Sequence, residues 1–436
     1  MLNQRTQLRG VGTSHHQVTA VPLAPLLLTI SAVLLPALFP IQVNLWAVDA
    51  RTFQQDAFKT PAALIRGQGY PCEEHSTVTK DGYILTLQRI PYGLIQPGLR
   101  QYAHRTPVLL VHGLFSSAVE WVINYPHQSL GFILADAGYD VWLGNFRGTP
   151  HSNEHVTSET NSRQYWSYGL DEVALYDIPR LIDYVLGVSG FDSLFYAGFS
   201  QGNMAAFAML ADLPEYNQKV RLMAALAPVC NMTYIRTPLR VLAPIPRLLG
   251  IGTNPRLHGA LLQVGPLRKQ VMYTLCEAPW RLVCGIPTFF SFGVNLNQLN
   301  QTRLPVYLAH IPSGASRKNV AQFGQFIRVS NFRHFDYGRD KNLARYGTPI
   351  PPKYETLKIT TPIALLYSKG DYFGNPDDVA VLRKSLRSVV WDYEVPSDSF
   401  VHLDFVLGVE ARRLVYDPLI KHMDQMRQQE ILTWTK

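Results

Sequence analysis

The chain has 436 residues, of which 47% are hydrophobic and 17% are charged. This composition can bury a large core, and it lacks the high charge and low hydrophobicity of disordered proteins. The formal net charge is +8, but the lysines and arginines are scattered rather than clustered, so we expect no nucleic-acid partner.

The first 50 residues resemble a targeting segment. Arg5 and Arg9 precede a largely apolar run without charged residues from about 18 to 47. A basic start followed by an apolar stretch is typical of a secretory signal, and Ala47 and Ala50 offer small residues for cleavage. The run is also long enough to cross a bilayer, so an uncleaved signal anchor is the alternative. In both cases we expect the rest of the chain to be secreted or to face a lumen, such as that of a lysosome.

Beyond this leader, short β-prone runs alternate with helical patterns. The β-prone runs lie at residues 76–79, 83–90, 107–111, 140–143, 193–197, 220–227, 362–367 and 389–395. One helical pattern ends near residue 138. Four others cover residues 170–186, 202–213, 377–386 and 404–416. Asp81-Gly82, between the first two β-prone runs, is a strong hairpin signal. The alternation predicts an α/β fold with right-handed crossovers and a mainly parallel sheet covered by helices on both faces.

Residues 231–352 interrupt this alternation and are rich in proline, glycine and aromatic residues. The stretch is too long for a simple loop. We interpret it as a cap inserted between two strands, so that residues 51–230 and 353–436 form the two parts of one core. The apolar segment 286–292 is either a lid face that meets lipid or part of the cap's own core.

Two features of the cap and its border fit an oxidising compartment. Asn231 and Asn300 each open an Asn-x-Thr sequence, the acceptor pattern for N-glycosylation. Cys276 and Cys284 are close enough in sequence to form a short disulfide loop. No Cys-x-x-Cys pair or His/Cys cluster indicates a metal site. We therefore expect neither a metal nor a cofactor.

The sequence Gly-Phe-Ser-Gln-Gly at 198–202 matches Gly-x-Ser-x-Gly. It lies between a predicted strand and a predicted helix, the context that this motif requires in the α/β-hydrolase fold. The flanking glycines avoid side-chain clashes in the tight turn, and the helix start directs N–H groups towards developing negative charge. Ser200 is therefore the predicted nucleophile.

A serine hydroxyl is a weak nucleophile until a base accepts its proton. In this fold an acid and then a histidine follow the serine along the chain. His402 follows the last predicted strand after a short loop, so it is the expected base. Of the other downstream histidines, His310 and His334 fall in the proposed cap and His422 in the terminal helix.

Asp371 comes directly after the preceding strand, where the acid is expected. Asp377 and Asp378 are the rivals, but both have the character of first-turn helix residues that favour the helix dipole. Asp404 is placed to orient local structure near His402. The predicted acid is therefore Asp371.

Acyl transfer also needs hydrogen-bond donors for the oxyanion. The backbone N–H of Gln201, just after the nucleophile, is one expected donor. The loop His112-Gly113-Leu114, after the strand at 107–111, should supply the other. We nominate the backbone N–H of Leu114 and interpret His112 as a structural residue rather than a second base.

Together with these residues, several motifs resemble the acid lipases, the family that contains gastric and lysosomal lipases and many insect relatives. The similarity runs from about Ala57 to the C-terminus. The matching segments are Gly-Tyr-Pro at 69–71, Glu-His at 74–75, Thr-Lys-Asp-Gly-Tyr at 79–83, Ala-Asp-Ala-Gly-Tyr-Asp-Val-Trp-Leu-Gly-Asn at 135–145, Arg-Gly at 147–148, Gly-Asp at 370–371 and His-Leu-Asp-Phe at 402–405. Cys276 and Cys284 lie where the family has its cap disulfide, with a slightly different spacing.

The resemblance implies a serine lipase that hydrolyses neutral lipids such as triacylglycerols or sterol esters at a lipid–water interface. Two positions depart from the family pattern. Phe199 stands where the family usually has histidine, and Ser368-Lys369 interrupts the usual Gly-Gly before the acid. We expect altered substrate or pH preference and an intact triad.

Two alternatives remain open. A catalytically silent lipid carrier on the same fold is one, although it would not need to keep Ser200, Asp371 and His402 together. An esterase for short-chain esters is the other, and the long apolar cap favours lipids over it. The sequence gives no indication of the oligomeric state.

Overall fold

The computed structural model describes residues 55–94, 104–238, 240, 259–276, 284, 286, 292–293 and 295–434. The predicted leader, residues 1–50, lies outside these ranges, as does most of the apolar segment 286–292. Among the described residues, every helix is too short or too polar to span a bilayer.

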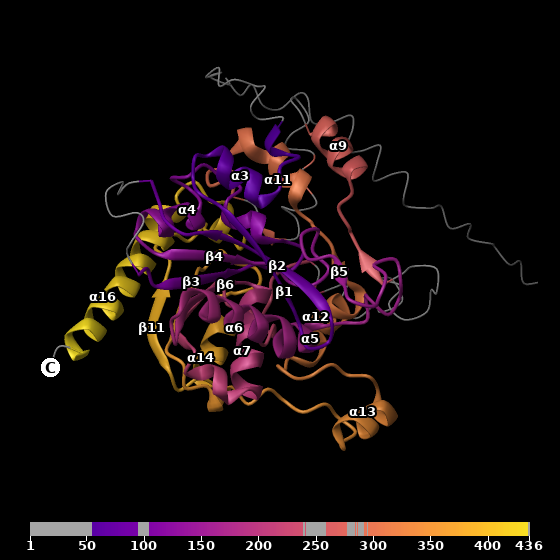
Figure 1. The fold of residues 1–436 in the computed structure, drawn as a ribbon. Coiled ribbons are helices and arrows are strands. Elements are labelled where there is room, and N and C mark those ends of the chain that lie inside the picture. The colour runs from indigo at the N-terminus through magenta and orange to yellow at the C-terminus, as the bar shows by residue number, and fades with distance from the viewer. Residues whose placement is uncertain are drawn as a thin grey trace, which may run out of the picture. The chain divides into compact units, whose positions relative to one another are not determined.

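A nine-stranded sheet forms the centre of the core (Figure 1). Its strands are β1 (Glu73–Val78), β2 (Tyr83–Ile90), β3 (Pro107–Val111), β4 (Asp140–Gly144), β5 (Glu154–His155), β6 (Leu194–Phe199), β7 (Val220–Leu226), β10 (Ile363–Tyr367) and β11 (Val389–Glu394). The order is β1-β2-β4-β3-β6-β7-β10-β11, with β5 paired to β2. Neighbouring strands from β4 to β11 in this order are parallel. Strands β1 and β2 form the predicted antiparallel hairpin. The predicted α/β-hydrolase fold class is therefore confirmed.

The sheet has a core on each face. All residues of β3 and β6 are buried, as expected for strands covered on both sides. Along β6, Leu194 and Tyr196 pack into one core, whereas Phe195 and Ala197 pack into the other. Helices α6 (Ile178–Ser189), α7 (Gln201–Asp212) and α14 (Pro376–Lys384) cover the first face, and α4 (Leu130–Asp136) and α16 (Asp417–Trp434) cover the second. Figure 1 shows α6, α7 and α14 grouped on the same side of the sheet.

The predicted helix over 404–416 is broken in the structure. Helix α15 (Asp404–Leu407) ends at Gly408, whose ψ of 135° is extended, and a π-helical turn (Arg412–Tyr416) then leads into α16. Gln298 accepts the N–H groups of Val409 and Glu410, through its backbone oxygen at 2.9 Å and its side chain at 3.0 Å. Residues distant in sequence therefore end this helix. By contrast, residues 170–189 are helical throughout, as α5 (Leu170–Glu172), a π-helical turn (Val173–Asp177) and α6.

The stretch without predicted elements contains regular structure. It holds α9 (Pro266–Leu275), α11 (Leu304–His310), α12 (Arg317–Val329), α13 (Arg339–Tyr346), and a small sheet of β8 (Ala260–Leu261) and β9 (Ala315–Ser316). The described residues also form α3 (Pro61–Gly67) and the 3₁₀ helices Ala118–Trp121, Pro214–Asn217, Gln301–Arg303 and Thr356–Lys358. Cys276 and Cys284 are joined in a disulfide, and Asn231 and Asn300 are half-buried. We refer to residues 231–352 as the insertion.

A buried ionic network fastens the hairpin to the core. The Arg147 guanidinium donates to both oxygens of Asp81 in the β1–β2 turn, at 2.6 and 2.9 Å, and to Asp177 Oδ1 at 2.8 Å. The side chains of Arg147 and Asp177 have no exposed surface. The guanidinium also lies 3.8 Å from the centre of the Tyr83 ring. Removing Asp177 therefore leaves the buried guanidinium with only Asp81, whose side chain is partly exposed, as its charged partner.

We expect Asp177→Ala to lower the free energy of unfolding by about 3–5 kcal/mol, the usual effect of breaking a buried ion pair. Chemical denaturation measures this loss. Glu74→Ala is the matched control, because its ion pair with Arg66 is half-exposed and such pairs contribute at most about 1 kcal/mol. Equal losses in the two variants would contradict the prediction.

Candidate active site

Ser200 occupies a strained turn between β6 and α7. Its φ of 51° and ψ of −110° lie outside the regions that side-chain-bearing residues favour. The turn is tight because a Cβ at Gly202 would lie 2.5 Å from the Val111 oxygen, and one at Gly198 would lie 2.5 Å from Asn203 Oδ1. The two glycines of the motif are therefore required by close contacts, and they place Ser200 where β6 ends.

The structure brings Ser200, His402 and Asp371 into one hydrogen-bonded chain. Ser200 Oγ lies 2.9 Å from His402 Nε2, and His402 Nδ1 lies 2.8 and 3.0 Å from the two oxygens of Asp371. Because a carboxylate only accepts, Nδ1 carries the proton and Nε2 is left to accept from the serine hydroxyl. All three side chains are buried. This is the tautomer that a general base needs.

The Asp371 carboxylate is itself held by the backbone. Its Oδ1 accepts the N–H groups of Phe373 at 2.7 Å and Gly374 at 3.0 Å. These bonds fix the carboxylate in the turn after β10. They also satisfy a buried charge that water does not reach.

The rival acids and histidines lie elsewhere. Asp377 and Asp378 occupy the first turn of α14, as predicted. The alternative histidines are each bound to other groups: His310 Nε2 donates to the Asp56 oxygen, His334 bridges Asp171 and Asp212, and His422 stacks on Trp391. Asp404 lies next to the His402 loop, where the sequence placed it, and accepts the N–H of Val401.

His112 orients the loop that follows β3. The Phe146 N–H donates to His112 Nε2 at 3.1 Å, so His112 Nδ1 carries the proton and donates to the Gly113 oxygen at 2.8 Å. In a planar trans peptide the C=O and the next N–H point in opposite directions. The Leu114 N–H is therefore directed away from His112. A Cβ on Gly113 would lie 2.9 Å from the Phe199 ring and 3.4 Å from Ser200 Cβ. Gln201 is the first residue of α7, where N–H groups have no partner within the helix.

Glu120 also binds the loop that follows β3. Its Oε1 accepts the Gly113 N–H at 3.2 Å, and the side chain is buried. Burial raises the pKa of Glu120 to about 8, against the smaller effects of hydrogen bonds from Ser116 and Gly113. Burial also lowers the pKa of His112 to about 4. Both groups are therefore neutral between these values, and the loop contains no unpaired charge.

Three phenylalanine rings surround the His402 imidazole. The ring centres of Phe199, Phe373 and Phe292 lie 4.9, 5.1 and 6.0 Å from that of His402, and Phe292 is almost parallel to it, at 13°. Phe199, the residue that departs from the family pattern, therefore packs on His402, the predicted base. Rings of this kind keep water from the imidazole.

Sequence reasoning missed the contributions of Phe292, Phe373 and Glu120. Phe292 belongs to the apolar segment of the insertion, but nothing local indicates its partner. Glu120 carried a usable signal, since it is a lone carboxyl in the apolar run Ala118–Trp121 shortly after the Gly113 loop. Within the described ranges, no group of three or more His, Cys, Asp and Glu side chains is arranged to hold a metal ion.

The chain is similar in sequence to known lipases and α/β hydrolases. A family profile for the partial α/β-hydrolase lipase region matches residues 61–125, and one for the α/β hydrolase fold matches residues 106–395. Lipase member M of Homo sapiens is 34% identical over 394 residues, which cover 90% of this chain and 92% of that protein. Gastric triacylglycerol lipase of Bos taurus is 35% identical over 373 residues, or 84% of this chain and 92% of that protein.

The chain belongs to the α/β-hydrolase lipases. The resemblance to the acid lipases is thereby confirmed, and the protein is a carboxylic ester hydrolase by family. A solved structure from Sulfolobus solfataricus, assigned as a lipase, matches with a TM-score of 0.52 at 15% identity, over 81% of this chain and 93% of that one. At that identity the match supports the fold alone.

The stability of this lipase should depend on the protonation of His112. Its pKa lies at about 4 in the folded protein, below the ordinary value of 6.5, so the unfolded chain binds more protons between these pH values. The contribution of neutral His112 is complete above pH 6.5 and is lost as the pH falls to 4. Between pH 7 and pH 4, we expect His112→Gln to lose about 3 kcal/mol less unfolding free energy than the wild type. Denaturant titrations at the two pH values measure this, and equal losses would contradict it.

Proposed function

We propose that the protein is a lipase that hydrolyses neutral lipid esters through an acyl-enzyme intermediate on Ser200. His402 is the general base and Asp371 orients it. The observation that carries this proposal is the chain of hydrogen bonds from Ser200 Oγ through the His402 imidazole to Asp371. It matches the roles required for acyl transfer by a serine hydrolase.

The mechanism follows from these positions. Ser200 Oγ attacks the ester carbonyl while His402 Nε2 takes its proton, and the imidazolium then protonates the leaving alcohol. Water, activated by the same imidazole, releases the fatty acid. The backbone N–H groups of Leu114 and Gln201 stabilise the oxyanion in both steps. A single such donor is commonly worth ~10²–10³ in rate.

The substrate class is supported by the surroundings of the base and by the relatives. Phe292, Phe373 and Phe199 make an apolar wall at His402. One relative is named a triacylglycerol lipase. The proposed substrates are therefore triacylglycerols or sterol esters at a lipid–water interface.

The proposed organisation is a core of residues 51–230 and 353–436 with the insertion as a cap over the site. The stacking of Phe292 on His402 supports it, because this places a residue of the insertion directly at the base. A secreted or lysosomal location fits the apolar leader, the disulfide Cys276–Cys284 and the two sequons. At the second sequon, the Thr302 hydroxyl donates to Asn300 Oδ1 at 2.7 Å.

The test compares hydrolysis of emulsified triolein and of a soluble short-chain ester by the wild type and Ser200→Ala. We expect the wild type to hydrolyse triolein and the variant to lose ~10⁶-fold in turnover. Ser167→Ala is the control, because this exposed serine bonds only the Arg163 oxygen through its hydroxyl and should keep full activity.

Each other outcome has a distinct meaning. Turnover of the short ester alone would replace the lipase by an esterase. A wild type that hydrolyses neither ester at acidic or neutral pH would overturn the proposal in favour of a lipid carrier.

A further inference from the structure

Residues 292–293 and 295–299 of the insertion, which we call segment 292–299, lie along the loop that carries His402. The contact begins at the base, where the Phe292 ring lies almost parallel to the imidazole. At the next residue, Gly293 has a φ of 99°, and a Cβ there would lie 2.9 Å from Val401 Cγ1. We call the contacts between residues 292–299 and 399–410 the seam.

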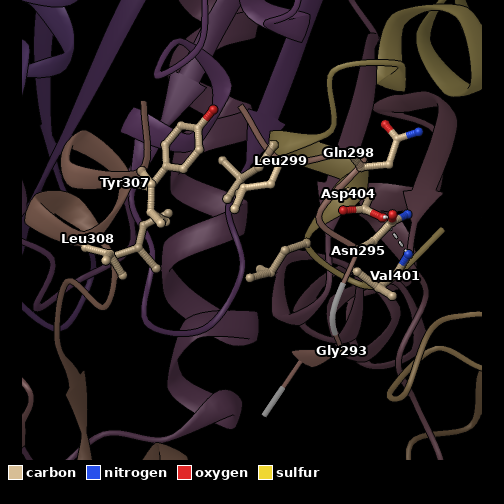
Figure 2. A pocket seen from close by; sticks show the side chains of 12 residues that line it. Gly293, Asn295, Gln298, Leu299, Tyr307, Leu308, Val401 and Asp404 are labelled. Atoms are coloured by element: carbon tan, nitrogen blue, oxygen red, sulfur yellow. Dashed lines mark hydrogen bonds between the residues drawn. The ribbon is translucent and has the colours of Figure 1, made fainter. Parts of the chain in front are cut away.

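The centre of the seam is a pair of polar side chains. Asn295 Nδ2 donates to the Ser399 oxygen at 2.7 Å and to Asp404 Oδ2 at 3.0 Å. The same Asp404 oxygen accepts the Val401 N–H at 2.8 Å, and the Asp404 N–H donates to the Val401 oxygen at 3.0 Å. Figure 2 shows Asp404, Asn295 and Val401 meeting at this point. Asn295 and Asp404 thus bind the chain on both sides of His402.

The far end of the seam is also held by hydrogen bonds. Besides accepting from Val409 and Glu410, Gln298 donates to Glu410 Oε2 at 2.6 Å. Leu299 and Gly408 form an isolated antiparallel bridge. The insertion therefore follows the histidine loop over its whole length, from the imidazole to the end of α15.

Side chains do not completely fill the centre of the seam. A cavity of about 40 Å³ lies there, and Figure 2 shows the side chains around it. Its wall includes Gly293, Asn295 and Leu299 from the insertion and Val401, Leu403 and Asp404 from the histidine loop. That volume is enough for two or three water molecules. Packing therefore restrains this part of the loop less, and the hydrogen bonds of Asn295 and Asp404 help to set its position.

From this geometry we propose that Asn295 and Asp404 are positioning residues for His402, and that they make the orientation of the base depend on segment 292–299 of the insertion. The proposal rests on the proposed function, in which His402 activates Ser200. A displacement of this segment would remove the two hydrogen bonds that Asn295 donates and free the turn that holds the imidazole towards Ser200. The insertion would then control the orientation of His402 and also form a wall of the site.

Asp404 also adds a charge that varies with pH. Burial raises the pKa of Asp404 to about 7, with a further contribution from Asp371, against hydrogen bonds from Val401 and Asn295 that lower it. Asp371 is the charged group that acts on it, His402 lies two residues before it in the chain, and Tyr307 lines the same cavity. Below pH 7 the Asp404 carboxyl is therefore mostly neutral, and above pH 7 it is mostly ionised and a stronger acceptor for the N–H groups of Asn295 and Val401. Asp404→Asn, which is neutral at every pH, should therefore lower kcat more above pH 7 than below it.

The test uses the full-length chain with Asn295→Ala, Asn295→Asp and Asp404→Asn. Asn295→Asp keeps the size of the side chain but sets an acceptor against Asp404. Asp398→Asn is the control, a carboxyl in the same loop whose side chain is 85% exposed and bonds only Lys369. The readouts are kcat and KM on a soluble short-chain ester, and the rate at which a fluorophosphonate modifies Ser200.

We expect both Asn295 variants to lower kcat and the fluorophosphonate rate together by about 10–100-fold, with KM within about twofold, since a displacement near 1 Å commonly costs 10²-fold. Asp398→Asn should match the wild type. Reduced kcat with an unchanged fluorophosphonate rate would overturn the proposal, as would wild-type rates in both Asn295 variants. A ratio of Asp404→Asn kcat to wild-type kcat that is the same above and below pH 7 would also overturn it. If the wild type hydrolyses no ester, the proposed function fails, and the fluorophosphonate rates alone decide on the seam.

Discussion

The hydrogen bond between Ser200 and His402 requires two distant loops to meet, and the surrounding structure holds them together. It joins the end of β6 to a loop beyond β11, on the other side of β7 and β10. The two loops meet because parallel strands end at one edge of the sheet, where α/β proteins place their sites. The tight turn with its two glycines places Ser200 at this edge, and backbone N–H groups hold Asp371 there.

The polar groups that hold the Gly113 loop are matched so that the loop carries no charge near neutral pH. His112 and Glu120 are buried on the Gly113 loop, and burial moves their pKa values in opposite directions, so both are neutral over a wide pH range. Each still makes a directed hydrogen bond to the loop. The loop is thus oriented without a fixed charge that would compete with the oxyanion.

The insertion contributes to the site as well as interrupting the core. Its Phe292 stacks on the base, and its Asn295 and Gln298 bond the loop that follows. These contacts also explain why the helix expected over 404–416 ends at Gly408. A stretch with no recognisable strand–helix alternation therefore helps to determine the geometry of residues more than 100 positions away.

The sequence by itself determined the sheet, the elbow and the identity of Ser200, Asp371 and His402 as candidates. Buried strands are continuous apolar runs, and the glycines around Ser200 are demanded by local backbone contacts, so both are visible in short windows. Only the tertiary structure decided what surrounds the base: Phe292 on the imidazole, Asn295 against Asp404, and Glu120 on the Gly113 loop. These contacts join segments that no local pattern links, because their energy comes from burial and hydrogen bonds formed after the chain has folded.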